Sequence, residues 1–425
     1  MFQSFEVTSR PEQGPPRLAA LRNEIKAEGL DGFLVPRADV HQGEYVAPHD
    51  ERLQWLTGFT GSAGFCAALV GAAGVFIDGR YRTQVKTQIA DVYTPVAWPE
   101  VSLAEWLREQ LPQGGIVGFD PWLHAAAQIE QLNGALEGSD IEMRRCDNLV
   151  DRIWKDQPAP PVQIAKVHPI EFAGESHADK AARLGKSLRD CGAAAAVITL
   201  PDSLCWLLNI RGADIARNPV MHGFVVLHGS GNVDLFADPA KVGQLKPHLG
   251  STVTLHAPEA LLDYVQTLAG PVRLDKATVP VAIADVIANR VTWGDDPCAL
   301  PKACKNAAEV AGSAAAHLRD GAALVELLAW LDQQPTGTVT ETQVVSRLED
   351  FRRRDNALQD ISFETIAGTG PNGAIMHYRV TKDTDSVLED GQLLVLDSGG
   401  QYLDGTTDIT RTIAIGSALP EAKQA

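Results

Sequence analysis

The sequence predicts an α/β fold (α+β in its last part), with two related α/β domains followed by a third domain of long helices and strands. Two observations predict this order. The first two parts of the chain repeat one succession of elements, and proline-rich stretches separate the parts. The 425 residues are 45% hydrophobic and 21% charged, which excludes collagen-like, coiled-coil and disordered chains.

The first part opens with a predicted helix and strand. Leu18, Leu21 and Ile25 recur at helical spacing, and the helix is expected to end near Gly29. The apolar run over residues 33–35 then predicts a strand. A tryptophan-containing segment, QWLTG, and an apolar hairpin, FCAALVGAAGVFIDGRY, complete the unit.

The second part follows the same order. Leu184 and Leu188 mark a helix capped by Gly192, and residues 195–198 predict a strand. The segments CWLLN and GFVVLHGSGNVDLFADP match the tryptophan segment and the hairpin of the first part. The shared order favours a duplicated fold over two independently acquired α/β patterns.

Prolines set the predicted domain boundaries. The stretch WKDQPAPPVQ predicts a linker, because proline has no amide hydrogen to donate and restricts its own φ. A weaker break, TWGDDPCALPKA, follows the second part. We therefore predict domains over residues 1–157, 162–300 and 301–425.

The third part begins with helical sequence and ends with strands. The stretch KACKNAAEVAGSAAAHLRDGAALVELLAWLDQQ predicts a long helix, which we expect to be broken at Gly312 and Gly321. Residues 340–343 predict the start of a second helix. Two strands, QLLVL and residues 406–415, are predicted near the end of the sequence.

Charge and composition limit the kinds of partner that the protein can have. The formal net charge of −17 repels nucleic acid on average, and the basic run at residues 352–354 is predicted to be a solvated helix face. The sequence has no apolar stretch long enough to span a membrane and no secretory signal pattern. The six scattered cysteines are typical of reduced thiols. We expect a cytoplasmic protein with no nucleic-acid or membrane partner.

Two aspartates are candidate metal ligands. Asp397 follows the predicted strand QLLVL, and Asp408 lies within the strand predicted over residues 406–415. If these strands pair antiparallel, the carboxylates approach across the sheet, where opposed Cβ atoms lie about 5 Å apart. Such carboxylates repel unless a cation lies between them, and their hard oxygens suit Mn²⁺, Mg²⁺ or Ca²⁺, with zinc and cobalt possible. The spacing leaves open that each aspartate only caps a turn.

His377 is a candidate catalytic residue, predicted on a strand after the glycine-rich turn TGPNG. A histidine beside an acidic pair can transfer protons near neutral pH, but a lone histidine on a strand is more often an ordinary core or surface residue, which the sequence pattern alone favours. The turn lacks the Lys-Ser/Thr ending of a phosphate loop, and no GxGxxG stands between a strand and a helix. No nucleotide cofactor is therefore predicted.

Several stretches resemble the Xaa-Pro aminopeptidases, a family of pita-bread metallopeptidases. LVLDSGGQYLDGTTDITRT resembles the metal-binding hairpin of the pita-bread enzymes, and TGPNGAIMHY resembles the stretch before it in Xaa-Pro aminopeptidases. HQGEYVAPHDERLQWLTGFTGSAGFC resembles the first domain of their three-domain cytosolic form. The resemblance implies two creatinase-type N-terminal domains followed by a partial pita-bread catalytic domain.

The resemblance also implies a site and a reaction. Asp397 would bind one metal ion and Asp408 would bridge two, which we expect to be Mn²⁺. His377 would bind the substrate carbonyl or pass a proton to the leaving proline nitrogen. In the family, a water held by the two ions attacks the carbonyl before proline. The implied substrates are peptides with proline in second position, and the implied assembly is a homodimer.

The family's remaining ligands, one His and two Glu, lie downstream of the hairpin. After His377 this sequence has no further histidine, and Glu421 is the only glutamate after the hairpin. We therefore expect an incomplete site in a truncated chain. A catalytically inactive relative that acts as a dimerisation or peptide-binding module is the alternative function. Prolidase, with one N-terminal domain, and creatinase, which lacks the aspartate pair, fit less well.

Overall fold

The computed structural model describes residues 1–417, which form two compact units. The N-terminal unit contains Ser9–Ile170 and Glu175–Cys304. The C-terminal unit contains Met1–Thr8, Glu171–Gly174 and the chain from Lys305 onward. The first eight residues of the chain therefore belong with its last part rather than with the residues that follow them.

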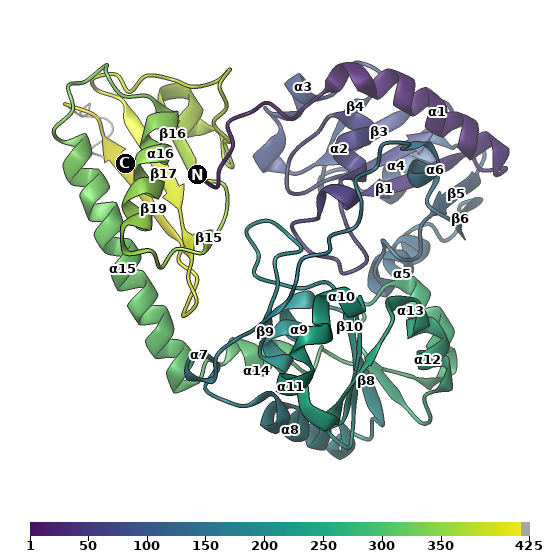
Figure 1. Ribbon diagram of the computed structural model, residues 1–425. Helices are drawn as coiled ribbons and strands as arrows, with labels where there is room; N and C mark the ends of the chain where they lie inside the picture. The colour runs from purple at the N-terminus through teal and green to yellow at the C-terminus, as the bar shows by residue number, and fades with distance from the viewer. Residues whose placement is uncertain (418–425) are drawn as a thin grey trace. The chain divides into compact units, whose positions relative to one another are not determined.

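The N-terminal unit contains two six-stranded sheets that share one topology (Figure 1). Their strand orders are β4-β3-β2-β1-β5-β6 and β12-β11-β10-β8-β13-β14. If the strands of each sheet are numbered one to six along the chain, both sheets have the spatial order 4-3-2-1-5-6. The three strands at the hairpin pair antiparallel and the others pair parallel in both sheets. The repeated order predicted from the sequence is confirmed.

The strands of the first sheet are β1 (Gly32–Pro36), β2 (Phe65–Leu69), β3 (Ala73–Ile77), β4 (Thr94–Ala97), β5 (Gly115–Phe119) and β6 (Ile141–Arg145). Its helices are α1 (Gly14–Ala27), α2 (Arg52–Thr57), α3 (Val85–Gln88), α4 (Leu103–Gln110), α5 (Ala126–Ala135) and α6 (Leu149–Ile153). The predicted first helix ends two residues before Gly29, whose φ of +65° only glycine adopts readily.

The strands of the second sheet are β8 (Ala195–Ile198), β10 (Phe224–His228), β11 (Val233–Phe236), β12 (Val253–His256), β13 (Val272–Leu274) and β14 (Val291–Trp293). Its helices are α8 (His177–Asp190), α9 (Pro201–Leu208), α10 (Pro239–Val242), α11 (Lys246–Leu249), α12 (Leu261–Thr267), α13 (Val281–Ile287) and α14 (Ala299–Ala303). After the predicted linker come the strand β7 (Lys166–Val167), which pairs with β9 (Ile210–Arg211), and the helix α7 (Ile170–Ala173).

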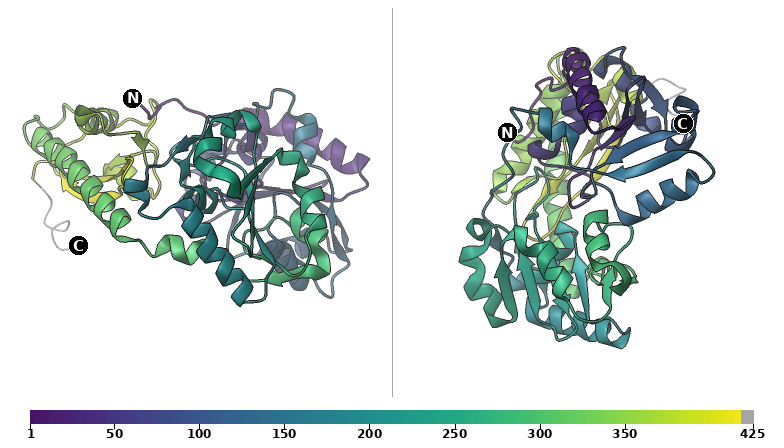
Figure 2. Two further views of the ribbon diagram at one scale, coloured as in Figure 1. Left: turned by 60° about the horizontal axis from the view of Figure 1, so that its bottom comes forward. Right: turned by 90° about the vertical axis from the view of Figure 1, so that its right-hand side faces the viewer.

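Both faces of each sheet are buried. Phe33 and Val35 of β1 pack into one apolar cluster, while Leu34 between them packs into another. Alternate side chains of a strand point to opposite faces, so the two clusters lie on the two sides of the sheet. Helices cover both sides, as Figure 2 shows for the second sheet. This double burial explains the continuous apolar runs that predicted the strands.

The C-terminal unit packs two helices on a small antiparallel sheet (Figure 1). The helices are α15 (Ala307–Leu331) and α16 (Glu341–Arg352), and the sheet has the order β16 (Ile366–Thr369), β17 (Leu393–Ser398), β19 (Ile409–Ala414). Two further short strands, β15 (Asp360–Ile361) just before β16 in the chain and β18 (Gly400–Gln401) just after β17, pair antiparallel with each other. Leu327, Val344, Leu348, Leu394 and Leu396 belong to the shared core.

The predicted break in the first long helix was wrong. The Asn306 side chain accepts a hydrogen bond from the Glu309 amide and caps a helix that continues through both Gly312 and Gly321. A Cβ at Gly312 would lie 2.4 Å from the Asp404 carbonyl oxygen, so glycine lets this loop approach the helix. A glycine costs a helix only about 1 kcal/mol, which packing against the sheet offsets.

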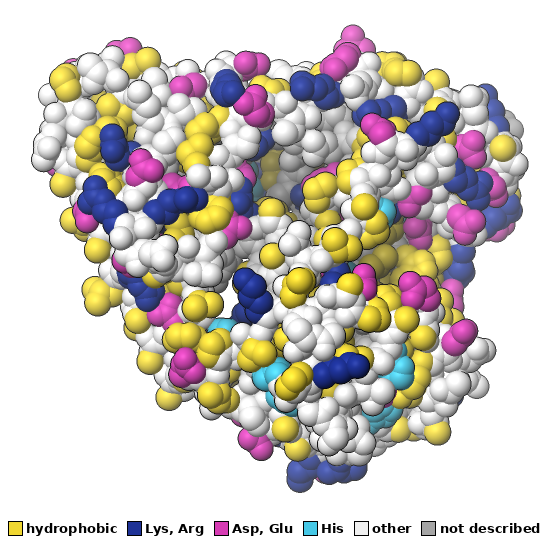
Figure 3. All heavy atoms as spheres, viewed as in Figure 1, with side chains coloured by type: hydrophobic (Ala, Val, Ile, Leu, Met, Phe, Trp, Pro, Cys, Tyr) yellow, Lys and Arg dark blue, Asp and Glu magenta, His cyan; other side chains and the backbone are white. Residues whose placement is uncertain are grey.

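Basic and acidic side chains are intermixed on the face drawn in Figure 3. Among residues 1–417, no helix is long and apolar enough to cross a membrane.

Candidate metal site

Asp397 lies near the end of the central strand of the C-terminal sheet. Leu394, Leu396 and Ser398 of β17 are buried, and Asp397 points to the opposite, partly exposed face. Asp397 lies opposite Ile366 of β16 and Thr410 of β19 in the two strand pairings. A strand on each side therefore holds its backbone in place.

Asp408 immediately precedes β19, which is shorter than the strand predicted over residues 406–415. Thr410, and not Asp408, lies directly opposite Asp397. Asp408 is two residues before Thr410, so it is a diagonal neighbour of Asp397, a relation that separates backbone positions by about 7–8 Å. The structure thus brings the two predicted carboxylates to one face, with diagonal rather than direct opposition.

The connection between the two aspartates is tight. The Gly400 amide donates to Oγ1 of Thr407 at 2.8 Å, and the Thr407 amide donates to the Gly400 carbonyl at 2.9 Å. A Cβ at Gly399 would lie 1.9 Å from the Thr407 carbonyl oxygen. Glycine at 399 therefore permits the close approach that returns the chain to Asp408.

The electrostatics of Asp397 are those of an incompletely satisfied carboxylate. Burial raises the pKa of Asp397, the Thr410 hydroxyl lowers it, Asp408 raises it further, and His377 lowers it. Its Oδ1 is buried and has no hydrogen-bond partner among residues 1–417. Buried polar atoms are usually paired, so this oxygen is free to bind a ligand that the chain does not itself supply.

The donor set fits a hard divalent cation. Asp397 contributes a buried oxygen without a partner, and Asp408 is an exposed carboxylate whose charge acts on Asp397. Carboxylate oxygens are ligands for Mn²⁺, and zinc and cobalt also accept them. Within residues 1–417 no group of three or more His, Cys, Asp or Glu side chains could hold a metal ion. Glu421, the one glutamate after the hairpin, lies outside the described residues.

His377 lies in a turn, and its prediction on a strand was wrong. It follows the 3₁₀ helix Gly370–Ala374, is exposed, and has a φ of +57°. This left-handed conformation is uncommon for a residue other than glycine, although histidine is enriched among the exceptions. Its charge lowers the pKa of Asp397, so an electrostatic effect links it to the aspartate pair, but the three side chains do not form a metal-binding group within residues 1–417.

A buried carboxylate holds the loop that carries His377. Glu341, which has no exposed surface, accepts hydrogen bonds from the Thr369 amide at 2.7 Å and from the Tyr378 hydroxyl at 2.9 Å. The side chain of Asn372 donates to both carboxylate oxygens of Glu341 at 3.1 Å. These hydrogen bonds of Glu341, here called the Glu341 clamp, were not predicted from the sequence. Thr369 and Asn372, both within the predicted turn TGPNG, take part in them.

A second buried network lies behind Asp397. The Arg352 guanidinium donates to Oγ of the adjacent Ser398 at 2.6 Å and to Asp320 at 2.7 and 3.0 Å. The Tyr402 hydroxyl also donates to Asp320, at 2.7 Å. Arg352 is 3% exposed, so predicting a solvated face for the whole basic run was wrong. The next two arginines of the run are exposed, as predicted.

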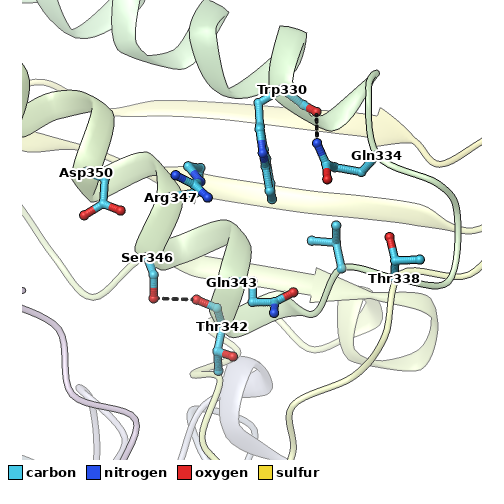
Figure 4. Close-up of a pocket in the computed structure, with 9 residues that line it drawn as sticks. Trp330, Gln334, Thr338, Thr342, Gln343, Ser346, Arg347 and Asp350 are labelled. Atoms are coloured by element: carbon cyan, nitrogen blue, oxygen red, sulfur yellow. Dashed lines mark hydrogen bonds between the residues drawn. The ribbon is translucent and has the colours of Figure 1, made fainter.

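A cavity of about 430 Å³ in the same unit is separate from these residues (Figure 4). Trp330 and Gln334 line it from the end of α15, and Ser346, Arg347 and Asp350 line it from α16. Arg347 lies 5.1 Å from the centroid of the Trp330 ring. None of the predicted site residues lines this cavity.

Models of three domain families match nearly the whole chain. The creatinase/prolidase N-terminal domain matches residues 17–153, and a second form of it matches residues 156–309. Metallopeptidase family M24 matches residues 303–425. The fold and the aspartate hairpin therefore define a metallopeptidase with two creatinase-type N-terminal domains.

Individual relatives narrow this class. A probable Xaa-Pro aminopeptidase P from Coccidioides posadasii is 36% identical over 99% of this chain and 68% of its own length. One from Aspergillus niger is 35% identical over 96% of this chain and 70% of its own length. The crystal structure of X-prolyl aminopeptidase from Caenorhabditis elegans, described as a cytosolic enzyme with a di-nuclear active site, matches with a TM-score of 0.90. That structure is 28% identical and covers 96% of this chain and 71% of its own. The chain belongs to the Xaa-Pro aminopeptidase P family.

Proposed function

We propose that this protein is a metal-dependent Xaa-Pro aminopeptidase, which hydrolyses the bond between an N-terminal residue and a following proline. The observation that carries the proposal is the carboxylate pair of Asp397 and Asp408 on one sheet face, with a buried Asp397 oxygen left without a partner. Membership of the aminopeptidase family and the di-nuclear site of the worm relative support it.

In this proposal Asp397 and Asp408 are ligands of a di-nuclear Mn²⁺ centre. Such ions, when bound, would lower the pKa of a water and so supply the nucleophile for hydrolysis of the bond before proline. Asp397 and Asp408 would contribute two negative charges to this centre. Zinc or cobalt are the other candidates, because both accept carboxylate oxygens.

His377 acts on the leaving group or on the carbonyl. The nitrogen of an Xaa-Pro bond carries no hydrogen, so it must gain a proton to leave as a secondary amine. An exposed imidazole on a clamped turn near Asp397 can deliver that proton, or it can hold the carbonyl in place by donating a hydrogen bond. The Glu341 clamp fixes the turn and so limits the positions that the ring can adopt.

Hydrolysis of an Arg-Pro-Pro peptide tests this function. We would assay the 425-residue chain and a fusion that adds the C-terminal part of the Aspergillus niger relative, with and without Mn²⁺. Mn²⁺-dependent release of arginine by the fusion is expected, and Asp408→Ala should reduce it by more than about 100-fold. Asp383→Ala, at an exposed aspartate, is the matched control and should retain activity. Full activity in Asp408→Ala would contradict the ligand assignment.

A non-catalytic peptide-binding or dimerisation module is the second candidate. It is favoured by the absence of a third ligand near the aspartate pair within residues 1–417. The module would bind Arg-Pro-Pro without turnover and independently of Mn²⁺. Peptide binding that requires Mn²⁺ would contradict this candidate and favour the enzyme.

The proposed assembly is a cytoplasmic homodimer. The worm relative is described as cytosolic, which supports the location. Sedimentation equilibrium should give twice the 45.6 kDa mass of the chain, and a mass of one chain at micromolar concentration would contradict the dimer.

A further inference from the structure

The first eight residues of the chain are attached to the C-terminal unit by main-chain and side-chain hydrogen bonds. The Phe2 amide donates to both carboxylate oxygens of Glu349, at 2.8 and 2.9 Å. The Lys382 amide donates to the Phe5 carbonyl at 2.9 Å, and the Arg379 guanidinium donates to the Ser4 carbonyl at 3.0 Å. This segment, Met1–Thr8, is here called the N-terminal strap.

Gln3 makes the most specific contact of the strap. Its carboxamide nitrogen donates to the Thr365 carbonyl at 3.2 Å, and its carboxamide oxygen accepts from the Thr365 amide at 2.8 Å. Gln3 and Thr365 are each 3% exposed. One side chain therefore satisfies both main-chain polar groups of a buried residue, as a neighbouring strand would. Without Gln3 both groups would be buried and unpaired.

Thr365 connects Gln3 to the candidate metal site. Its hydroxyl lies 2.7 Å from Oγ of Ser398, the residue after Asp397. The residue after Thr365, Ile366, lies opposite Asp397 in the pairing of β16 with β17. A short path of contacts thus leads from Gln3 to two neighbours of Asp397, Ser398 in the chain and Ile366 across the sheet.

We propose that Gln3 is a positioning residue for Asp397, acting through Thr365 and Ser398, and that the N-terminal strap is a working part of the catalytic domain. This inference rests on the proposed function only in taking Asp397 as a metal ligand. The family models match residues 17–153 and 303–425. The second range contains Thr365, but Gln3 lies before both ranges. The domain that carries the chemistry then includes both the beginning of the chain and its last part.

Hydrogen exchange and Mn²⁺ binding of the 425-residue chain test the proposal together. Gln3→Ala should accelerate amide exchange at residues 362–369 and 393–398, while exchange in the N-terminal unit stays unchanged. It should also weaken Mn²⁺ binding by about tenfold, the usual effect of losing a group that orients a ligand. Gln3→Glu keeps the acceptor for the Thr365 amide but sets a buried carboxylate oxygen against the Thr365 carbonyl, so it should restore neither measurement.

Two controls separate positioning from general stability. Gln113→Ala removes an exposed glutamine of the N-terminal unit and should change neither measurement. Val344→Ala loosens the buried core of α16 and should lower the melting temperature without changing Mn²⁺ affinity while the unit stays folded. Gln3→Ala is expected to differ from Val344→Ala in its effect on the metal.

The outcomes distinguish the strap from the function. Wild-type exchange at residues 362–369 in Gln3→Ala would overturn the proposal. Faster exchange with unchanged Mn²⁺ affinity would also overturn it, because the strap would then support the fold alone. If the wild-type chain binds no Mn²⁺, the metal assignment itself fails. The strap is then judged by exchange at residues 393–398, where acceleration supports it and no change contradicts it.

Discussion

Two carboxylates in different regions of the molecule, Asp234 in the second sheet and Asp397 in the C-terminal sheet, respond differently to burial. Nε2 of His228 and Nε2 of His256 lie 2.7 and 2.6 Å from the oxygens of Asp234, and the Tyr264 hydroxyl donates to it at 2.5 Å. Burial alone would raise the pKa of Asp234, but these partners lower it to about 2. Asp397 has a raised pKa and an oxygen without a partner.

The difference teaches what kind of carboxylate can serve a ligand. The protein supplies every partner that Asp234 needs, so its charge stabilises the fold and is not available to a metal ion. Asp397 is partly buried, keeps one oxygen without a partner although the Thr410 hydroxyl lowers its pKa, and has a second carboxylate beside it. An unpaired buried charge costs stability unless something else neutralises it, which is the property that a metal site requires.

The first sheet confirms that the Asp234 cluster is one structural solution among several. Asp234 lies opposite Thr254 on the neighbouring strand, and Gly74 holds the same place opposite Thr94 in the first sheet. A Cβ at Gly74 would lie 3.0 Å from the Trp106 ring, which fills the space that the polar cluster takes in the second sheet. One topology therefore accepts either an aromatic ring or a hydrogen-bonded carboxylate here.

The largest expected effect would come from Asp320, a fully satisfied carboxylate in the same unit as Asp397. Asp320→Asn leaves the buried Arg352 charge without its partner and should lower the free energy of unfolding of this unit by about 4 kcal/mol. Urea denaturation followed by hydrogen exchange in α15 and α16 measures it. Asp332→Asn, at an exposed aspartate, is the control and should change the stability little. If Asp320→Asn lowers the free energy of unfolding as little as Asp332→Asn does, the claim that satisfied carboxylates stabilise the fold is contradicted.

A smaller effect is expected at Asp234, and it should depend on pH. Asp234→Asn should lower the free energy of unfolding by about 2 kcal/mol at pH 7, because the charged acceptor of three hydrogen bonds is lost. The folded pKa of about 2 lies below the ordinary value of 3.8, so this contribution is complete above pH 4. It should fade as the pH drops from about 4 to 2.

Thermal unfolding of the N-terminal unit across that pH range checks the Asp234 result. Asp263→Asn, at an exposed aspartate of the same unit, is the matched control. Equal pH profiles for the wild type and Asp234→Asn would contradict it.

The smallest effect has the opposite sign. Asp397→Asn removes a buried charge that stands beside another carboxylate, so it should raise the free energy of unfolding by about 1 kcal/mol at pH 7 without metal. Because burial raises the folded pKa, the wild type should gain the same stability as the pH falls through that pKa. Calorimetry with chelator present measures both changes, and Asp383→Asn is the exposed control. A destabilised Asp397→Asn would mean that the favourable contact with the Thr410 hydroxyl outweighs the cost of burying the charge beside Asp408.

Local patterns were enough to predict the sheets and the aspartate hairpin. Apolar runs such as residues 33–35 and 195–198 predict strands because both faces of each sheet are buried. The glycines between Asp397 and Asp408 predict a tight return of the chain, and Gly399 does lie against the Thr407 carbonyl. Such signals lie within a few residues of the structure that they specify.

The features that the sequence could not predict depend on distant partners. Arg352 is buried because Asp320 lies beside it, 32 positions earlier in the chain. Gln3 and Thr365 are separated by 362 positions. His377 leaves the predicted strand because Glu341, far from it in the sequence, holds the preceding turn. No local pattern contains the identity of such a partner.

Mn²⁺ titration of the 425-residue chain, followed by the paramagnetic resonance signal of the free ion, tests the central claim most directly. The wild type should bind Mn²⁺ saturably, and Asp397→Asn and Asp408→Asn should each weaken binding by at least about tenfold, because each removes a charged ligand. Asp234→Asn should bind as the wild type does, since its carboxylate is satisfied within the protein. Wild-type binding by the double variant of Asp397 and Asp408, or loss of binding in Asp234→Asn, would contradict the account.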